Sequence, residues 1–362
     1  MTSSERVAVV GTGMMGTSIA MAAIRAGDAV RGFDTDPEAL ATAGARSELV
    51  AAGSFAECVE GSTLVFVCTP VPAVADVVCE ALQLAPGAVV SDVASVKERV
   101  RSRVAGSARA ADLGRYVGGH PMGGSERSGP EHASASVLDG IVWVIDERSE
   151  ADPADRVEAF VRKVGARPVR MDGDRHDRLV AIVSHLPQVA STTLMGLAAT
   201  EESGEPEILL LAAGGFRDLT RLAASSPHLW GDILLANGEA VGRAIDLYIA
   251  RLGALREMVR AGDAAGVEQA FGQAKDARLS LAAKPTVRAG VAVLQVPVPD
   301  RPGVLAEVTA TMSDAGVNIE DLQIVHSPEG GRGTVHLTVA AEAAPAAERA
   351  LRERWFEPLR LA

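Results

Sequence analysis

A glycine-rich turn near the N-terminus constrains the fold of this chain more than any other feature. Gly11-Thr-Gly13-Met-Met-Gly16 follows the apolar run Val7–Val10 directly and opens a stretch rich in Ala and Ile. Gly11 permits a tight turn between strand and helix, Gly13 lets the backbone approach a pyrophosphate, and Gly16 lets the helix pack closely on the strand. In this context the three glycines predict a dinucleotide-binding βαβ unit.

An acidic residue at the end of the second apolar run discriminates among dinucleotides. A carboxylate at Asp34 would accept hydrogen bonds from the adenosine ribose and repel a 2′-phosphate. This favours NAD over NADP, while FAD, S-adenosylmethionine or a turn that binds nothing are the alternatives. The segment Cys68–Pro72 is expected along the cofactor's edge. The predicted cofactor-binding residues are Gly11, Gly13, Met14, Met15, Gly16, Asp34 and Thr69.

Short apolar runs alternate with helical stretches from residue 6 to residue 172. Nearly continuous apolar runs are typical of parallel strands that helices cover on both faces. Asp36 and Pro37 mark one intervening helix, because Asp suits the N-cap and Pro the first helical position. The pattern predicts a Rossmann-type, doubly wound α/β domain over residues 1–172. Its expected strands lie at residues 7–10, 29–33, 64–68, 88–91, 116–118 and 141–145.

The pattern changes to long amphipathic helices at about residue 173. Apolar residues share one helical stripe from Leu179 to Val189 and another from Val241 to Val259. No strand pattern interrupts these helices until about residue 290. We predict an all-α domain over residues 173–284, whose wide apolar stripes suit either internal packing or dimerisation.

Strand character returns at residues 291–298, after a linker at residues 282–286. The stretch 300–308 then predicts a helix, and extended runs follow at residues 317–325 and 334–339. A helical stretch from Pro345 and a last apolar segment complete the chain. The order βαββαβ predicts a small ferredoxin-like α+β domain over residues 290–362.

Composition and charge limit the classes of partner. Apolar residues make up 48% and charged residues 23% of the chain, as is typical of folded, soluble proteins. The net charge of −12 repels nucleic acid and anionic lipid, so we expect neither a nucleic-acid nor a membrane partner. Cys58, Cys68 and Cys79 match no metal-binding spacing, and no metal is expected. The N-terminal stretch lacks an unbroken apolar run, which predicts a cytoplasmic protein.

A histidine follows the strand expected at residues 116–118. The carboxyl edge of a parallel sheet is where α/β proteins bind their ligands. His120 can accept a proton from a substrate alcohol there, while a hydride leaves for a nicotinamide, because imidazole titrates near neutrality. A purely structural histidine is the alternative.

Three later motifs, in order behind the glycine-rich turn, resemble those of prephenate/arogenate dehydrogenases. They are His120-Pro-Met-Gly-Gly-Ser-Glu126, Ser184-His-Leu-Pro-Gln188 and Gly214-Gly-Phe-Arg-Asp-Leu-Thr-Arg-Leu-Ala223. The segment Asp92-Val-Ala-Ser-Val-Lys97 and the helical domain also look like that family. The resemblance therefore covers essentially the whole chain.

The resemblance implies roles for individual residues. His120 is expected to accept the hydroxyl proton, and Ser95 to orient the hydroxyl and the nicotinamide. Arg221 is expected to pair with a substrate carboxylate, which suits a planar and permanently charged guanidinium. The remaining substrate-binding residues that the resemblance implies are Ser125, Glu126, Asp218, Gln188 and Trp230, the last packing near the substrate across a dimer.

Gln188 departs from the family pattern, because some relatives carry a second histidine there. An amide can hydrogen-bond a carbonyl, a carboxylate or an ammonium but cannot titrate, so the preferred substrate stays open. The other histidines of this region, His176, His185 and His228, are interpreted as helix-cap or packing residues.

The resemblance implies NAD-dependent oxidation and decarboxylation of prephenate to 4-hydroxyphenylpyruvate, on the route to tyrosine, by a homodimer. Arogenate or an amino-substituted prephenate is the alternative substrate. A β-hydroxyacid dehydrogenase would instead be expected to carry a catalytic lysine on the helical domain. A non-catalytic sensor of NAD or amino acids is the alternative from another class, and the presence of His120, Ser95 and Arg221 argues against it.

The last domain resembles ACT domains, which often bind amino acids at a strand-to-helix turn. The segments Pro299–Glu307 and Ala315–Glu320 carry this resemblance. Backbone N–H groups at the start of a helix can hold a carboxylate, and tyrosine is the expected feedback ligand. A purely oligomerising module is the alternative. The expected regulatory residues are Gly303, Val304, Leu305 and Asn318.

Overall fold

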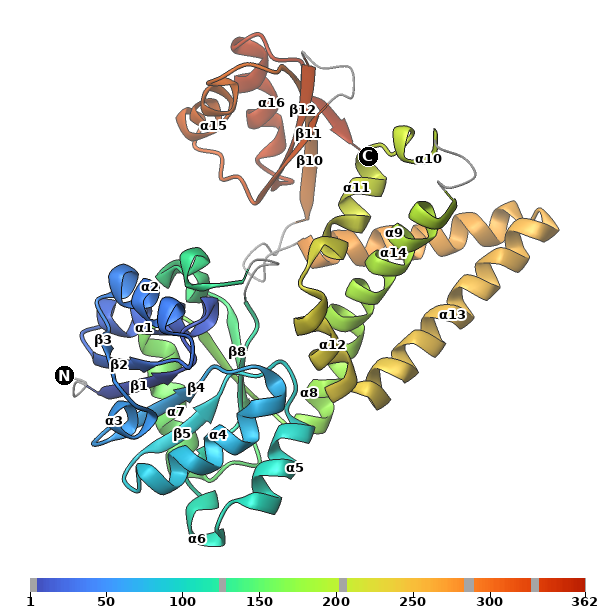
Figure 1. Cartoon of the computed structure of the whole chain (residues 1–362). Helices are drawn as coiled ribbons and strands as arrows, with labels where there is room; N and C mark the ends of the chain where they lie inside the picture. Colours follow the sequence, from blue (N-terminus) through green and yellow to red (C-terminus); the bar gives the residue numbers. More distant parts are fainter. Residues whose placement is uncertain (1–4, 124–127, 202–206, 283–289, 327–331, 362) are drawn as a thin grey trace. The chain divides into compact units, whose positions relative to one another are not determined.

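The structure is a computed structural model that describes residues 5–123, 128–201, 207–282, 290–326 and 332–361 (Figure 1). It divides into two compact units. The first comprises residues 1–197 and 220–248, and the second comprises residues 198–219 and 249–362. Most of the predicted linker at residues 282–286 lies outside the described residues.

The first unit is built on a six-stranded parallel sheet with the strand order β3-β2-β1-β4-β5-β6. Alternate residues of β1 enter two separate clusters of buried apolar side chains, Val7 and Val9 on one face and Ala8 and Val10 on the other. The predicted doubly wound α/β fold is therefore confirmed. The strands are β1 (Arg6–Val10), β2 (Ala29–Phe33), β3 (Val50–Ala51), β4 (Leu64–Val67), β5 (Val89–Asp92) and β6 (Tyr116–Val117).

Helices cover both faces of this sheet. The cluster of Val7 and Val9 also contains residues of α1, α2 and α7, whereas the cluster of Ala8 and Val10 contains residues of α3, α4 and α5. Asp36 caps α2 as predicted, because its carboxylate accepts from the backbone N–H of Glu38 at 2.9 Å. The helices are α1 (Met14–Arg25), α2 (Pro37–Ser47), α3 (Phe55–Val59), α4 (Val71–Leu84), α5 (Glu98–Ser107), α6 (Ala110–Leu113) and α7 (Ala151–Lys163).

A second, three-stranded sheet completes the α/β part and corrects the predicted strand arrangement. The run at residues 141–145, expected in the parallel sheet, forms β8 (Val142–Asp146), which pairs antiparallel with β7 (Gly119–Pro121) and parallel with β9 (Arg167–Met171). Two single turns of 3₁₀ helix, Pro130–His132 and Ala135–Leu138, lie between β7 and β8. His120 therefore lies in β7 itself, just beyond β6.

Helices then replace strands up to Ala282 among the described residues, as predicted. α8 (Gly173–Val180), a π-helical turn (Ala181–His185) and α9 (Leu186–Glu201) follow one another without a break. Several residues of the predicted apolar stripes are exposed in the single chain, including Val183 at 67% and Val259 at 65%. The remaining helices are α10 (Glu207–Leu210), α11 (Gly214–Thr220), the 3₁₀ turn η4 (Arg221–Ala224), α12 (Pro227–Ala236), α13 (Gly238–Ala261) and α14 (Ala264–Ala282).

The C-terminal part has the predicted order βαββαβ. Its antiparallel sheet has the strand order β11-β12-β10-β13 and packs its apolar face against both helices, through buried residues that include Leu294, Met312, Leu337 and Leu351. The elements are β10 (Val291–Pro299), α15 (Val304–Asp314), β11 (Asp321–His326), β12 (Arg332–Ala340), α16 (Ala344–Glu353) and β13 (Leu359–Leu361).

Candidate active site

The glycine-rich turn has the backbone geometry that a dinucleotide site requires. Gly11 has a φ of +94°, and a Cβ atom added there would lie 2.6 Å from the carbonyl oxygen of Cys68. A Cβ atom on Gly16 would lie 2.0 Å from the carbonyl oxygen of Gly11. Gly13, in contrast, has no atom within 4 Å of the position its Cβ would take, so its backbone borders open space. The turn can therefore admit a pyrophosphate at Gly13.

Polar groups around this turn also suit a dinucleotide. The Asp34 carboxylate accepts from the backbone N–H of Thr12 at 2.6 Å and from that of Asp36 at 2.9 Å, which holds it beside the turn. The first turn of α1, which contains Met14 and Met15, carries no acidic side chain, so the positive end of its dipole favours an anion. The buried hydroxyl of Thr69 has no hydrogen-bond partner among the described residues. These features fit NAD.

A chain of hydrogen bonds connects His120 to a carboxylate. His120 Nδ1 lies 2.8 Å from His176 Nε2, and His176 Nδ1 lies 2.8 Å from Asp177 Oδ1. An ionised carboxylate only accepts, so His176 must carry its proton on Nδ1 and leave Nε2 as an acceptor. His120 then donates from Nδ1 and keeps a lone pair on Nε2. The chain thus selects the tautomer in which His120 Nε2 can accept a proton.

The surroundings keep His120 uncharged. Burial lowers its pKa well below the ordinary value, and neighbouring His176, Lys97 and His185 lower it further. Burial likewise lowers the pKa of His185 to about 4. His120 is therefore in the form that can accept a proton, and the same lowering of its pKa makes the imidazole a weaker base.

The structure excludes the helix-cap role for His176, which is buried against His120, and excludes both predicted roles for His228. The N-cap of α8 is Asp172, which accepts from the N–H of Arg175 at 3.0 Å, so His176 is not a helix cap and instead contacts His120. His185 is a packing residue, as expected, buried and 3.2 Å from Asn237 Nδ2. His228 is 89% exposed and lies 4.0 Å from Asp232, so it neither packs nor caps.

Gln188 is tied to the turn that carries Arg221. Its Nε2 donates to the carbonyl oxygen of Leu222 at 2.8 Å and to Thr192 Oγ1 at 3.3 Å. Because a carbonyl oxygen can only accept, this contact fixes which end of the amide faces Leu222. The other end, Oε1, is buried and has no partner among the described residues. Arg221 itself is exposed in the single chain.

The structure describes three of the remaining predicted site residues and not the other two. Ser95 is half-buried in the loop after β5. Trp230, on α12, makes an edge contact with His185, with ring centroids 6.1 Å apart. Asp218 belongs to the second unit. Ser125 and Glu126 lie outside the described residues.

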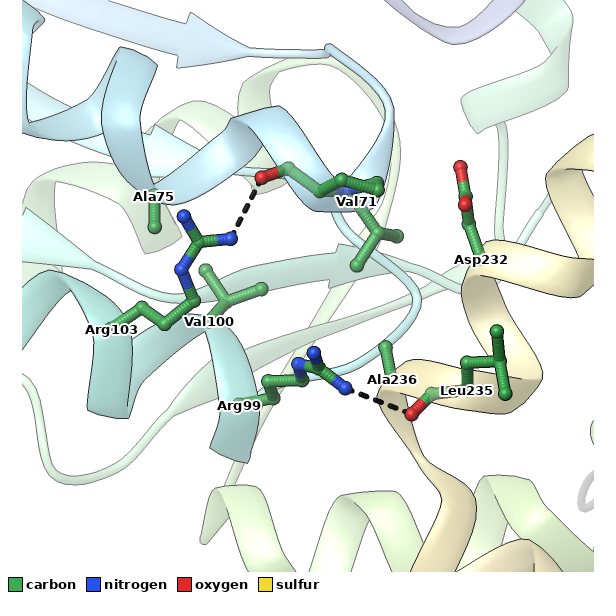
Figure 2. Close-up of a pocket in the computed structure, with 9 residues that line it drawn as sticks. Val71, Ala75, Arg99, Val100, Arg103, Asp232, Leu235 and Ala236 are labelled. Carbon is green, nitrogen blue, oxygen red and sulfur yellow. Dashed lines mark hydrogen bonds between the residues drawn. The ribbon is translucent and has the colours of Figure 1, made fainter.

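A cavity of about 170 Å³ lies between α4, α5 and α12 (Figure 2). Arg99 crosses from α5 to donate to the carbonyl oxygen of Leu235 at 2.9 Å, at the C-terminal end of α12. Arg103 donates to the carbonyl oxygen of Pro72 at 2.8 Å. No predicted site residue lines this cavity, and its arginines hold helices together. In the part of the chain that the structure describes, no group of three or more His, Cys, Asp or Glu side chains could bind a metal.

Comparison with known families accounts for three successive parts of the chain. A model of the prephenate dehydrogenase nucleotide-binding domain matches residues 19–170, and a model of the prephenate dehydrogenase dimerization domain matches residues 172–273. An ACT domain model matches residues 292–356.

Individual relatives extend over nearly the full length. A prephenate dehydrogenase of Bacillus subtilis is 29% identical over 350 residues, which is 93% of each chain. A probable prephenate dehydrogenase of Streptomyces niveus is 30% identical over 96% of this chain and 97% of its own. The solved prephenate dehydrogenase of A. aeolicus, in complex with hydroxyphenyl propionate and NAD⁺, is 26% identical, with a TM-score of 0.72 over 77% of this chain and 99% of its own. The chain belongs to the prephenate dehydrogenase family.

Proposed function

We propose that this chain is an NAD-dependent prephenate dehydrogenase, which converts prephenate to 4-hydroxyphenylpyruvate and carbon dioxide. The observation that carries this proposal is the chain of hydrogen bonds from Asp177 through His176 to His120, which leaves His120 Nε2 as a proton acceptor. A relative whose structure contains NAD⁺, and the fit of Asp34 and Thr69 to a dinucleotide, support NAD as the cofactor.

His120 moves the proton in this mechanism. NAD, which the glycine-rich turn at Gly13 and the Asp34 carboxylate would hold, would supply the hydride acceptor for the ring carbon that bears the hydroxyl. His120 Nε2 takes the hydroxyl proton, and a ring ketone forms. The ring carboxylate then leaves as carbon dioxide, its bonding electrons make the ring aromatic, and the phenolate oxygen takes the proton back from His120. We assign Ser95 to orienting the hydroxyl and Arg221 to pairing with a substrate carboxylate.

Arogenate is the second candidate substrate, and Gln188 favours it. The amide nitrogen of Gln188 is already bonded to Leu222, so only the carbonyl oxygen is left for another partner. An acceptor suits the ammonium group of arogenate or of an amino-substituted prephenate better than the keto group of prephenate. Substrate contacts of Ser125, Glu126, Asp218 and Trp230 remain part of this proposal.

We further propose a homodimer with domain boundaries near residues 172 and 284–290. The match to a dimerization domain and the exposed apolar stripes of the helical region support dimerisation. The helical stretch Gly173–Thr200 is long and apolar enough to cross a membrane by composition alone. Hydrogen bonds of His176 and Asp177 join the start of this stretch to the α/β part, which supports our proposal of a cytoplasmic protein.

Tyrosine is the proposed feedback ligand of the ACT domain. Gly303 precedes α15 with a φ of +90°, and no atom lies within 4 Å of the position its Cβ would take. Leu305, in the first turn of α15, is 36% exposed, and Asn318 Nδ2 donates to Glu320. We assign Gly303, Val304, Leu305 and Asn318 to the tyrosine site, where N–H groups of α15 would face its carboxylate.

The choice of substrate is tested by supplying prephenate and arogenate separately with NAD and following NADH formation. We expect NADH to form with prephenate. A higher kcat/KM for arogenate than for prephenate would mean that the Gln188 carbonyl oxygen dominates recognition of the substrate. A Gln188→His variant should shift the ratio of kcat/KM toward prephenate, because imidazole can donate to a keto or carboxylate oxygen. A protein that binds NAD and oxidises neither compound would instead be a sensor.

Removal of the proton acceptor tests the mechanism. His120→Asn should lower kcat by about 10²-fold or more, because the hydroxyl proton loses its acceptor. The Kd for NAD should change little. His228→Asn is the matched control, since His228 is exposed and lies outside the hydrogen-bonded chain. Near-normal turnover in His120→Asn would place the base elsewhere.

Asp34 should decide the preference for NAD over NADP. Asp34→Ser should narrow this preference by about tenfold, equivalent to about 1.4 kcal/mol, because the repulsion of the 2′-phosphate is removed. Asp36→Ser is the matched control, since serine can still cap α2. The measurement is kcat/KM for each cofactor. Equal use of both cofactors by the parent enzyme would contradict the assignment of Asp34.

Feedback through the ACT domain predicts that truncation after Lys284 removes tyrosine inhibition while activity remains. Tyrosine resembles the product and can also compete at Arg221, so inhibition of the full chain alone decides nothing. Inhibition through a second site requires different affinities for two states of the enzyme. Inhibition by tyrosine is measured in both proteins, with Asn318→Ala in the full chain as a milder variant. An active truncated enzyme with full tyrosine sensitivity would place the inhibitory site in the catalytic pocket.

A further inference from the structure

A lysine ammonium is buried behind the candidate active site. Lys97 ends the loop between β5 and α5, and it is only 1% exposed. Its Nζ lies 2.5 Å from Asp92 Oδ1 and also donates to the carbonyl oxygen of Gly119. Lysine is almost never fully buried unless it is paired, and the mechanism above gives this charge no task.

The partner carboxylate is fully engaged. Asp92 Oδ1 accepts from the backbone N–H of Ala94 at 2.9 Å, and Asp92 Oδ2 accepts from the Tyr116 hydroxyl at 2.7 Å. Burial, with the nearby Asp92, raises the pKa of Tyr116 well above its usual value, so the hydroxyl stays a donor. A buried ion pair is often no more stabilising than apolar residues of similar volume. Stability alone therefore does not explain the Lys97–Asp92 pair.

Lys97 holds His120 by two routes. Its ammonium binds the carbonyl oxygen of Gly119, in the peptide bond that joins Gly119 to His120. Its backbone N–H donates to Asp177 Oδ1 at 2.8 Å, and the same oxygen receives the hydrogen bond from His176. One residue thus fixes both the backbone of His120 and the carboxylate that sets the tautomer of its ring.

We propose that Lys97 is a positioning residue, whose buried ammonium aims His120 and the loop that carries Ser95 for proton transfer. This inference rests on the function proposed above. The Lys97 charge also acts on the ring directly, because it lowers the pKa of His120. Among the described residues, the titratable groups that act on the ring are Lys97, His176 and His185, and Asp92, Tyr116 and Asp177 are bonded to members of the same network.

Lys97→Met tests the proposal, because methionine keeps most of the side-chain length but neither donates nor carries charge. We expect kcat to fall by about 10-fold to 10²-fold through misplacement of His120, with little change in the Kd for NAD. Loss of the cation makes protonation of His120 easier, so the acid limb of the kcat/KM profile should move to higher pH. Added methylammonium should restore part of kcat in Lys97→Ala, and methanol at the same concentration should not.

Two further proteins separate positioning from stability. Lys97→Met leaves Asp92 buried and unpaired, so Lys97→Met/Asp92→Asn removes both charges, and it should fold yet keep the low kcat. Lys163 pairs with Asp28 at 2.5 Å, at the edge of the sheet opposite to Asp34. Asp28 is buried and Lys163 is half-buried, so Lys163→Met is the control for breaking a lysine–aspartate pair outside the hydrogen-bonded chain of His120. It should lower Tm without moving the pH profile.

Histidine NMR gives a readout that does not depend on turnover. In protein with ¹³C-labelled histidine, His120→Asn identifies the His120 signal, whose titration should move to higher pH in Lys97→Met. Failure of the parent to oxidise either prephenate or arogenate would overturn the proposed function. The His120 titration in Lys97→Met would then still test whether Lys97 acts on His120. An unchanged kcat, pH profile and titration in folded Lys97→Met, or parental kcat in the double variant, would overturn the role of Lys97.

Discussion

The candidate active site depends on one buried carboxylate, that of Asp177. It accepts from the backbone N–H groups of Lys97 at 2.8 Å and Glu98 at 2.9 Å, where α5 begins, and from His176 Nδ1. The backbone carbonyl oxygen of Asp177 accepts from Asn237 Nδ2 at 2.8 Å, at the end of α12. A single residue therefore joins the α/β part, the histidine pair and α12. A carboxylate can only accept in these hydrogen bonds, so Asp177 also fixes the donor role of His176 Nδ1.

Those parts of the fold that have strong local signals could be predicted from the sequence. The glycine-rich turn, the buried strands of the central sheet and the order βαββαβ each follow from the residues of a short segment. β3 was missed because Val50–Ala51 is too short to show any periodicity. β9 was missed because Arg167–Met171 contains a proline and two arginines and does not resemble a buried strand. The separate sheet of β7, β8 and β9 depends on pairings between distant segments, which no local pattern encodes.

The candidate site also contains residues that a local motif predicts and residues whose role depends on contacts between distant segments. The motif predicts His120, whereas no motif distinguishes His176, on α8, from a helix-cap or packing residue. Its partner His120 is 56 positions away in the sequence, and the preferred tautomer appears only when His120, His176 and Asp177 are seen together. One signal was available, since an adjacent His–Asp pair lies on the helix that follows the last strand of the α/β part. The roles of Ser125, Glu126 and Asp218 remain predictions.

Two lysine–aspartate pairs in this fold differ in how completely the hydrogen bonds of the carboxylate are satisfied. Asp28 accepts from Lys163 and from the backbone N–H of Glu5 through one oxygen, while its other oxygen has no partner among the described residues. Both oxygens of Asp92 are bonded, to groups that include the Lys97 ammonium and the Tyr116 hydroxyl. A fully satisfied buried polar network makes its surroundings more rigid. The complete network is the one behind His120, where a small displacement would cost most in proton transfer.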